Sequence, residues 1–138
     1  MKIAVAGTGY VGLVTGVCLS EHGHEVTCVD VDENKVKMME SGKSPIYEPG
    51  LEELMVKNMD HLYFTTDYKK AYVDADVIII AVGTPEKRDG SANLAYVFGV
   101  ASQIAASISK ECVVIVKSTV PIGTNDEVER LLNENPLE

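Results

Sequence analysis

The chain has 138 residues, of which 46% are hydrophobic and 24% are charged. A chain of this length is expected to form one soluble domain with a substantial buried core. Its net charge of −9 argues against a nucleic-acid interface, which needs a basic face. No apolar run approaches the roughly 20 residues that cross a membrane. The 3 cysteines and 3 histidines lack the spacing of a disulfide framework or a zinc site, so we expect a reducing cytoplasm and no metal.

Short β-prone runs alternate with helical patterns from the start of the chain. The first apolar run predicts a strand over Lys2–Ala6, and the spacing of apolar residues predicts a helix over Tyr10–Glu21. The run Glu25–Val31 predicts a second strand. A second helix is expected over Asp32–Ser41, with Asp32 as its capping residue.

The alternation continues after a loop that is rich in Gly and Pro. Leu51–Met59 is predicted to be a short helix, Leu62–Thr65 a weaker third strand, and Asp67–Val73 a short polar helix. The run Val77–Val82 is apolar throughout. A continuous apolar run of this length is typical of a central parallel strand that is covered on both faces.

The last third of the chain holds the clearest helical pattern. Apolar residues recur at positions i, i+3, i+4 and i+7 between Leu94 and Ile108, which predicts an amphipathic helix. Cys112–Val116 predicts a fifth strand, and Thr124 with Glu127 forms a potential capping box that opens a last helix. The whole pattern predicts an α/β fold with a doubly wound parallel sheet in the strand order 3-2-1-4-5.

Three glycines follow the first predicted strand in the pattern GxGxxG. Gly7 would permit the tight turn, Gly9 would let a pyrophosphate approach the backbone, and Gly12 would let the helix pack closely on the sheet. The free N–H groups near Tyr10 and Val11 and the helix dipole favour phosphate binding. The alternative is a glycine-rich turn without a ligand. In this strand–turn–helix context the motif predicts a Rossmann-type dinucleotide-binding domain over residues 1–138.

Asp30 lies at the end of the second predicted strand, 18 residues after Gly12 (30 − 12). A carboxylate at this place accepts hydrogen bonds from the adenosine ribose and repels a 2′-phosphate, which favours NAD over NADP. The alternative is that Asp30 only caps the next helix, although Asp32 is the better candidate for that role. Lys35 could reach the ribose or the phosphates, or could be an ordinary surface lysine.

Two further loops leave the predicted carboxyl ends of strands four and five, VGTPEKRDG and KSTVPIGT. Ligands of open α/β sheets bind at this edge, so the loops are candidates for cofactor contact, with plain loops as the alternative. Their candidate cofactor-binding residues are Gly83, Thr84, Ser118 and Thr119. Cys18, on the expected inward side of the first helix, and Cys28, within a strand, are interpreted as small core residues rather than nucleophiles.

Five segments together resemble the UDP-glucose/GDP-mannose dehydrogenase family. They are GTGYVGLVTG, VDVDENKV, SGKSPIYEPGL, AVGTPEKRDGSANL and VKSTVPIGT, and they span nearly the whole chain. The PIYEPGL and STVPIGT segments are far more specific than the glycine motif. STVP followed by Gly-Thr is more similar to the UDP-glucose members than to the GDP-mannose members.

The resemblance implies a cytoplasmic enzyme, a homodimer at full length, that oxidises the C6 alcohol of UDP-glucose to a carboxylate with two NAD. The family's reaction passes through a thiohemiacetal and a thioester on a Cys. Tyr10 would lie along the pyrophosphate, and Thr119 would also help to position a water, which makes it a candidate catalytic residue. By similarity the NAD-contacting residues are Val11, Asp30, Lys35, Thr84 and Thr119.

Several parts of the family pattern are not present in this sequence. The Gly-rich segment with the catalytic Cys, the catalytic Lys and Glu, the long central helix and the C-terminal UDP-binding domain have no counterpart here. We therefore expect a truncated domain that binds NAD and does not itself oxidise UDP-glucose. The alternatives are a domain of a related GDP-mannose or UDP-N-acetylmannosamine dehydrogenase, and a free-standing NAD-binding regulatory module.

Overall fold

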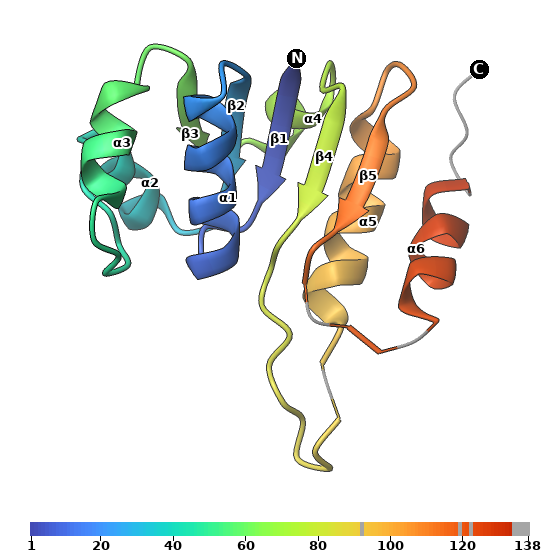
Figure 1. Cartoon of the computed structure of the whole chain (residues 1–138). Helices are drawn as coiled ribbons and strands as arrows, with labels where there is room; N and C mark the ends of the chain where they lie inside the picture. Colours follow the sequence, from blue (N-terminus) through green and yellow to red (C-terminus); the bar gives the residue numbers. More distant parts are fainter. Residues whose placement is uncertain (92, 119, 122, 134–138) are drawn as a thin grey trace.

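Five parallel strands form one sheet with helices on both of its faces (Figure 1). The structure is a computed structural model that describes residues 1–91, 93–118, 120–121 and 123–133. The strand order β3-β2-β1-β4-β5 confirms the predicted doubly wound Rossmann-type fold. In chain order the elements are β1 (Lys2–Ala6), α1 (Tyr10–Glu21), β2 (Glu25–Val29), α2 (Glu33–Glu40), α3 (Leu51–Lys57), β3 (Leu62–Thr65), α4 (Tyr68–Tyr72), β4 (Val77–Ile80), α5 (Ala95–Ser107), β5 (Val113–Val116) and α6 (Thr124–Asn133).

The direction in which strands are added reverses at β1. The chain adds β2 and β3 on one side of β1, then returns to add β4 and β5 on the other side. All strands are parallel, and the arrowheads of β1, β4 and β5 in Figure 1 point to the edge of the sheet where the loops after β1 and β4 leave in different directions. A crevice opens between such loops in doubly wound sheets, which makes this edge the place to look for a ligand.

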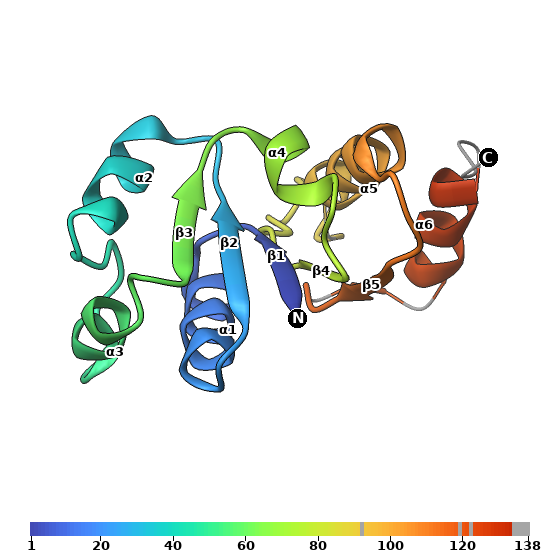
Figure 2. The ribbon, with the colours of Figure 1, turned by 90° about the horizontal axis from the view of Figure 1, so that it is seen from above.

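Two apolar cores lie on opposite faces of the sheet. One contains Leu13 of α1 and Met55 of α3, and the other contains Tyr72 of α4 and Ile104 of α5. All four side chains are buried. Figure 2 shows α1 and α3 below the sheet and α4 and α5 above it. Because successive side chains of a strand point to opposite faces, β1 supplies alternate residues to the two cores.

The inward side of α1 differs from the expected one. Cys18 is exposed, so its interpretation as a core residue is wrong. The buried stripe runs through Leu13, Gly16 and Val17 instead. A Cβ at Gly16 would lie 2.7 Å from the sulfur of Cys28, which shows how closely the helix approaches β2 at this glycine. Because α1 carries apolar residues on most of its circumference, periodicity alone did not identify its buried side.

Two strands end earlier than the sequence predicted. β2 ends at Val29, not at Val31, and Val31 is 93% exposed in the turn that follows. β4 ends at Ile80, not at Val82. The expected role of Asp32 is confirmed, since its carboxylate accepts hydrogen bonds from the backbone N–H groups of residues 34 and 35 at the start of α2.

The start of α6 also differs from the prediction. Thr124 is a buried residue inside the helix rather than the residue that caps it. The carboxylate of Glu127 accepts hydrogen bonds from the guanidinium of Arg130. A residue pair three positions apart on a helix surface can form such a contact, and here it takes the place of the reciprocal capping box.

The three cysteines should therefore react with a thiol reagent at separate rates. Cys18 is exposed, Cys112 is partly buried, and Cys28 is fully buried with a thiol pKa raised to about 12 by that burial. We expect Cys18 to react first and Cys28 to react only when the chain unfolds. Stopped-flow labelling of the native chain with a chromogenic disulfide, with the Cys18→Ser variant as control, measures this. Labelling of Cys28 in native chain as fast as in urea would contradict the fold.

Candidate functional site

The turn from β1 to α1 is built from two glycines that pack against backbone. Gly7 has a φ of +104°, a left-handed conformation that other residues rarely adopt. A Cβ at Gly7 would lie 2.7 Å from the carbonyl oxygen of Ala81 after β4. A Cβ at Gly12, in the first turn of α1, would lie 2.1 Å from the carbonyl oxygen of Gly7. The first turn of α1 is therefore pressed against the strand end from which it starts.

Gly9 lies between Gly7 and Gly12 in the sequence, but unlike them it is not packed against backbone. It is the N-cap of α1, and a Cβ there would meet no heavy atom within 4 Å. No side chain caps the helix, and its first turn holds no acidic residue. The first N–H groups of a helix have no partner within the helix, and together with its dipole they attract anions. The turn thus leaves backbone N–H groups open to a phosphate at Gly9, Tyr10 and Val11.

These groups face a cavity of about 610 Å³ at the carboxyl edge of the sheet. This volume lies within the range of small-molecule sites, roughly 300–1,000 Å³. The cavity brings together predicted site residues from three parts of the chain. From the first turn the lining residues are Gly7, Gly9, Tyr10 and Val11. From the end of β2 and the start of α2 they are Asp30 and Lys35, and from the loops after β4 and β5 they are Gly83, Thr84 and Ser118.

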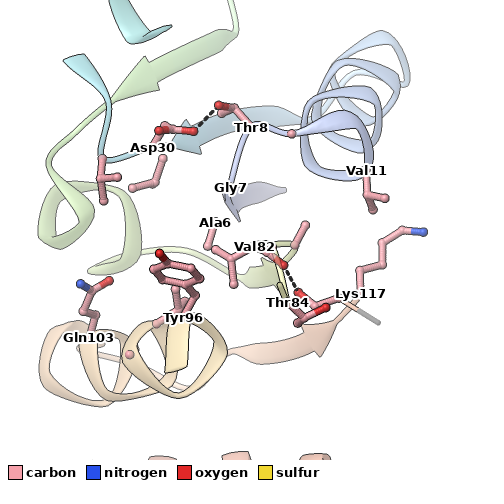
Figure 3. A pocket seen from close by; sticks show the side chains of 18 of the residues that line it. Ala6, Gly7, Thr8, Val11, Asp30, Val82, Thr84, Tyr96, Gln103 and Lys117 are labelled. Carbon is pink, nitrogen blue, oxygen red and sulfur yellow. Dashed lines mark hydrogen bonds between the residues drawn. The ribbon is translucent and has the colours of Figure 1, made fainter. Parts of the chain in front are cut away.

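Among the predicted site residues that the structure describes, Gly12 does not line the cavity. Gly12 acts one layer behind it, through its contact with Gly7. Thr119 lies outside the described residues. Its neighbour Ser118 donates a hydrogen bond of 2.8 Å to the carbonyl of Val82, which ties the loop after β5 to the loop after β4 (Figure 3).

The carboxylate of Asp30 is held by three donors at the rim of the cavity. The hydroxyl of Thr8 donates a hydrogen bond to its Oδ2, and the backbone N–H of Asp32 donates to its Oδ1 at 2.9 Å. The ammonium of Lys35 lies 3.4 Å from Oδ2. Figure 3 shows Thr8 and Asp30 together on one side of the cavity, across from Tyr96 and Gln103.

These contacts keep Asp30 ionised. Its partial burial opposes ionisation and is the largest single effect on its pKa. The hydrogen bonds from Thr8 and from the Asp32 backbone, together with the charge of Lys35, outweigh that effect, and the pKa of Asp30 falls below its ordinary value. At neutral pH the cavity therefore presents a negatively charged hydrogen-bond acceptor, the Asp30 carboxylate. Asp30 follows β2, and the glycine turn follows the neighbouring strand β1.

Tyr10 has a partner that the sequence did not suggest. A hydrogen bond to the carboxylate of Glu48 raises the pKa of the Tyr10 hydroxyl. Glu48 belongs to the Gly- and Pro-rich loop before α3, so this loop contacts the start of α1. Tyr10 remains 57% exposed.

Sequence reasoning missed part of the lining. Thr8 stands inside the glycine motif, and Lys117 stands immediately before Ser118. On α5 the missed residues are Tyr96 and Gln103, on either side of Gly99. A Cβ at Gly99 would meet nothing within 4 Å. A glycine in mid-helix weakens the helix, so Gly99 was an unusual feature of this segment, but it did not identify Tyr96 or Gln103.

The arrangement fits a dinucleotide. An uncapped helix start offers N–H groups to a diphosphate, and an ionised carboxylate at the end of the neighbouring strand offers acceptors to a ribose. The apolar side chains of the lining suit flat rings. Fold and site together define a Rossmann-type dinucleotide-binding domain.

Comparison with known proteins agrees with this class. The family model described as "UDP-glucose/GDP-mannose dehydrogenase family, NAD binding domain" matches residues 1–138. UDP-glucose 6-dehydrogenase YwqF of Bacillus subtilis is 55% identical over 140 residues, covering 100% of this chain and 32% of that protein. UDP-glucose 6-dehydrogenase of Rhizobium meliloti is 52% identical, covering 99% and 32%. A crystal structure of a ternary complex of GDP-mannose dehydrogenase from Pseudomonas aeruginosa has a TM-score of 0.93 at 44% identity, covering 97% and 32%.

The chain belongs to the UDP-glucose/GDP-mannose dehydrogenase family, as its NAD-binding domain, and NAD is its cofactor. It spans about a third of the length of the curated relatives that it matches. Within the described part of the chain, no helix has the length and apolar character needed to cross a membrane.

Substitution by alanine should lower the stability of the fold at Gly12 and the affinity for NAD at Gly9. Gly12→Ala forces a Cβ into the carbonyl of Gly7 and should destabilise the fold by about 3 kcal/mol, the upper end of the usual cost of overpacking. Gly9→Ala meets no protein atom, so the fold should keep its stability while the new methyl hinders the approach of the diphosphate. Urea unfolding and NAD calorimetry separate the two effects. Normal NAD affinity in Gly9→Ala would show that no ligand comes near this turn.

Proposed function

We propose that the chain is the cofactor domain, residues 1–138, of a UDP-glucose 6-dehydrogenase that oxidises UDP-glucose to UDP-glucuronate with two NAD. The names of the two relatives with 55% and 52% identity support this substrate. In the complete enzyme, NAD would accept the hydride. The residues of this chain would bind and orient that cofactor.

The observation that carries the proposal is the position of Asp30 beside the glycine turn. Within the cavity the N–H groups at Gly9, Tyr10 and Val11 would hold the diphosphate. The Asp30 carboxylate would accept from the ribose hydroxyls, and Lys35 would neutralise charge nearby. Because Asp30 is ionised, it would also repel a 2′-phosphate and so select NAD over NADP.

The loops after β4 and β5 would take the nicotinamide end. Gly83, Thr84 and Ser118 line that part of the cavity, and Lys117 lies there across from Val11 (Figure 3). The hydrogen bond from Ser118 to Val82 would keep the two loops together when the cofactor enters. For Thr119, contact with NAD and placement of a water stay proposals that rest on the family resemblance.

We propose further that this chain does not oxidise UDP-glucose by itself. None of its three cysteines lines the cavity, and Cys28 is buried with a raised pKa. A nucleophilic Cys for the covalent step would have to come from outside these residues, as would the sugar-binding groups.

This division of labour can be tested with purified chain, NAD and UDP-glucose. We expect no NADH above the rate of a control without sugar nucleotide, because the covalent step lacks its thiolate. NADH fluorescence measured over hours gives the answer. Steady NADH formation that requires UDP-glucose would overturn the proposed division.

Two other functions remain as competing proposals. A sibling enzyme acting on GDP-mannose or UDP-N-acetylmannosamine would share this domain, and only its sugar-binding part would distinguish it. A free-standing NAD-binding regulatory module is the other. A coding sequence that continues into a Gly-rich Cys motif would favour an enzyme, and a stop codon directly after residue 138 would favour the module.

The role of Asp30 can be tested with a matched pair of variants. Asp30→Asn should weaken NAD binding by about 1–3 kcal/mol, because a hydrogen bond to a charged acceptor is lost. It should also narrow the preference for NAD over NADP. Asp32→Asn removes the same charge two residues away while asparagine still caps α2, so it should leave both affinities nearly unchanged. Calorimetry with each dinucleotide measures this. Equal effects of the two variants would remove Asp30 from the ribose site.

A further inference from the structure

A buried hydroxyl stands directly behind the Asp30 carboxylate. Thr8 lies between Gly7 and Gly9 and is only 1% exposed. Its Oγ1 donates a hydrogen bond to Oδ2 of Asp30, which lies 22 residues further along the chain. Water cannot compete for a hydrogen bond at such a buried donor, so this contact fixes the carboxylate more firmly than a surface contact would.

The other two partners of Asp30 hold it less specifically. The backbone N–H of Asp32 fixes Oδ1 but belongs to the turn that follows β2, so any residue there would supply it. Lys35 is a long side chain, 35% exposed, whose ammonium lies 3.4 Å from Oδ2. Flexible, exposed ion pairs contribute little to orientation. Thr8 is thus the one partner that is both a side chain and rigidly buried among these three.

We propose that Thr8 is a positioning residue for cofactor selection: its hydroxyl holds the Asp30 carboxylate in the orientation that accepts from the adenosine ribose and excludes a 2′-phosphate. This inference rests on the proposed role of Asp30. Thr8 itself need not touch the cofactor for this role, although it lines the same cavity.

The geometry gives a reason for this assignment. Both oxygens of the Asp30 carboxylate accept a hydrogen bond from the protein, which sets the plane of this cavity-lining group. Without the Thr8 hydroxyl, Lys35 would be the remaining side-chain donor to Oδ2. It would draw the carboxylate toward α2 and away from the ribose. Threonine has few χ1 conformations, which keeps its hydroxyl in place before the cofactor arrives.

Thr8→Val replaces the hydroxyl by a methyl group of nearly the same shape. We expect it to weaken NAD binding roughly 5-fold, the equivalent of one net hydrogen bond. NADP binding should weaken less, so that the ratio of the two affinities falls. In the cofactor-free chain the pKa of Asp30, measured by carboxyl ¹³C NMR, should rise because one of its donors is lost. Thr8→Ser keeps the hydroxyl and should restore the pKa and the ratio.

Two results would overturn the inference. The first is an unchanged Asp30 pKa together with an unchanged NAD/NADP ratio in Thr8→Val. The second is an equal loss of both dinucleotides that Thr8→Ser does not recover, as a purely structural role would give. If Thr8→Val does not fold, as judged by circular dichroism, Thr8→Ala removes the same hydroxyl without adding volume and is read by the same two criteria.

The test separates this inference from the proposal on which it rests. The Asp30 pKa is measured without cofactor, so it reports on the Thr8–Asp30 contact whether or not Asp30 binds a ribose. If Asp30→Asn leaves NAD affinity unchanged, the ribose assignment fails. If Asp30→Asn weakens binding while Thr8→Val changes neither pKa nor selectivity, only the role of Thr8 fails.

Discussion

The carbonyl of Gly7 and the Cα of Gly12 approach so closely that no side chain fits between them. This contact places the first turn of α1 directly on the end of β1. The open N–H groups of α1 then face the cavity instead of solvent, and Asp30 comes within reach of the same ligand from the next strand. The proposed diphosphate site and the proposed ribose site would thus both arise from one backbone contact and from the parallel pairing of β1 with β2.

The protein binds an anionic cofactor although its own net charge is −9. The summed charge of the chain therefore works against association, and attraction has to come from local groups. Within the described lining those groups are the helix start, Lys35 and Lys117. The cavity also contains the ionised carboxylate of Asp30, which in the proposed role would favour NAD over NADP and would weaken the attraction of the cavity for anions. Backbone N–H groups suit a cavity that also contains a carboxylate. They attract phosphate but carry no full positive charge, so Asp30 does not neutralise them as it would a lysine.

Much of the fold was predictable from the sequence because its signals are local. The alternation of short apolar runs, such as the one that contains β4, with helical patterns, such as that of α5, predicted the class of fold and the strand order. The buried side of α1 was not predictable, since apolar residues surround most of that helix and only the packing of Gly16 on Cys28 decides the matter. The predicted ends of the strands were wrong for a related reason. Val31 is as β-prone as Val29, but the pairing of β2 with β3 stops at Val29.

The residues of the candidate site likewise fall into those that local sequence patterns predict and those that only the tertiary structure brings together. Gly7, Gly9 and Asp30 have fixed spacing relative to a strand and a helix, so their convergence in one cavity could be predicted. Thr8, Tyr96 and Gln103 could not be predicted in this way. Thr8 is brought to the site through a hydrogen bond to a residue 22 positions away, and the two α5 residues line the cavity because the chain crosses over to place α5 beside it. Such contacts depend on tertiary structure, which no local pattern encodes.

The most direct test of the account is a crystal structure of the chain grown with NAD. The account predicts the diphosphate against the N–H groups at Gly9 and Val11, with both adenosine ribose hydroxyls on the carboxylate of Asp30. A cofactor bound elsewhere, or one whose ribose faces solvent and makes no hydrogen bond to Asp30, would contradict it.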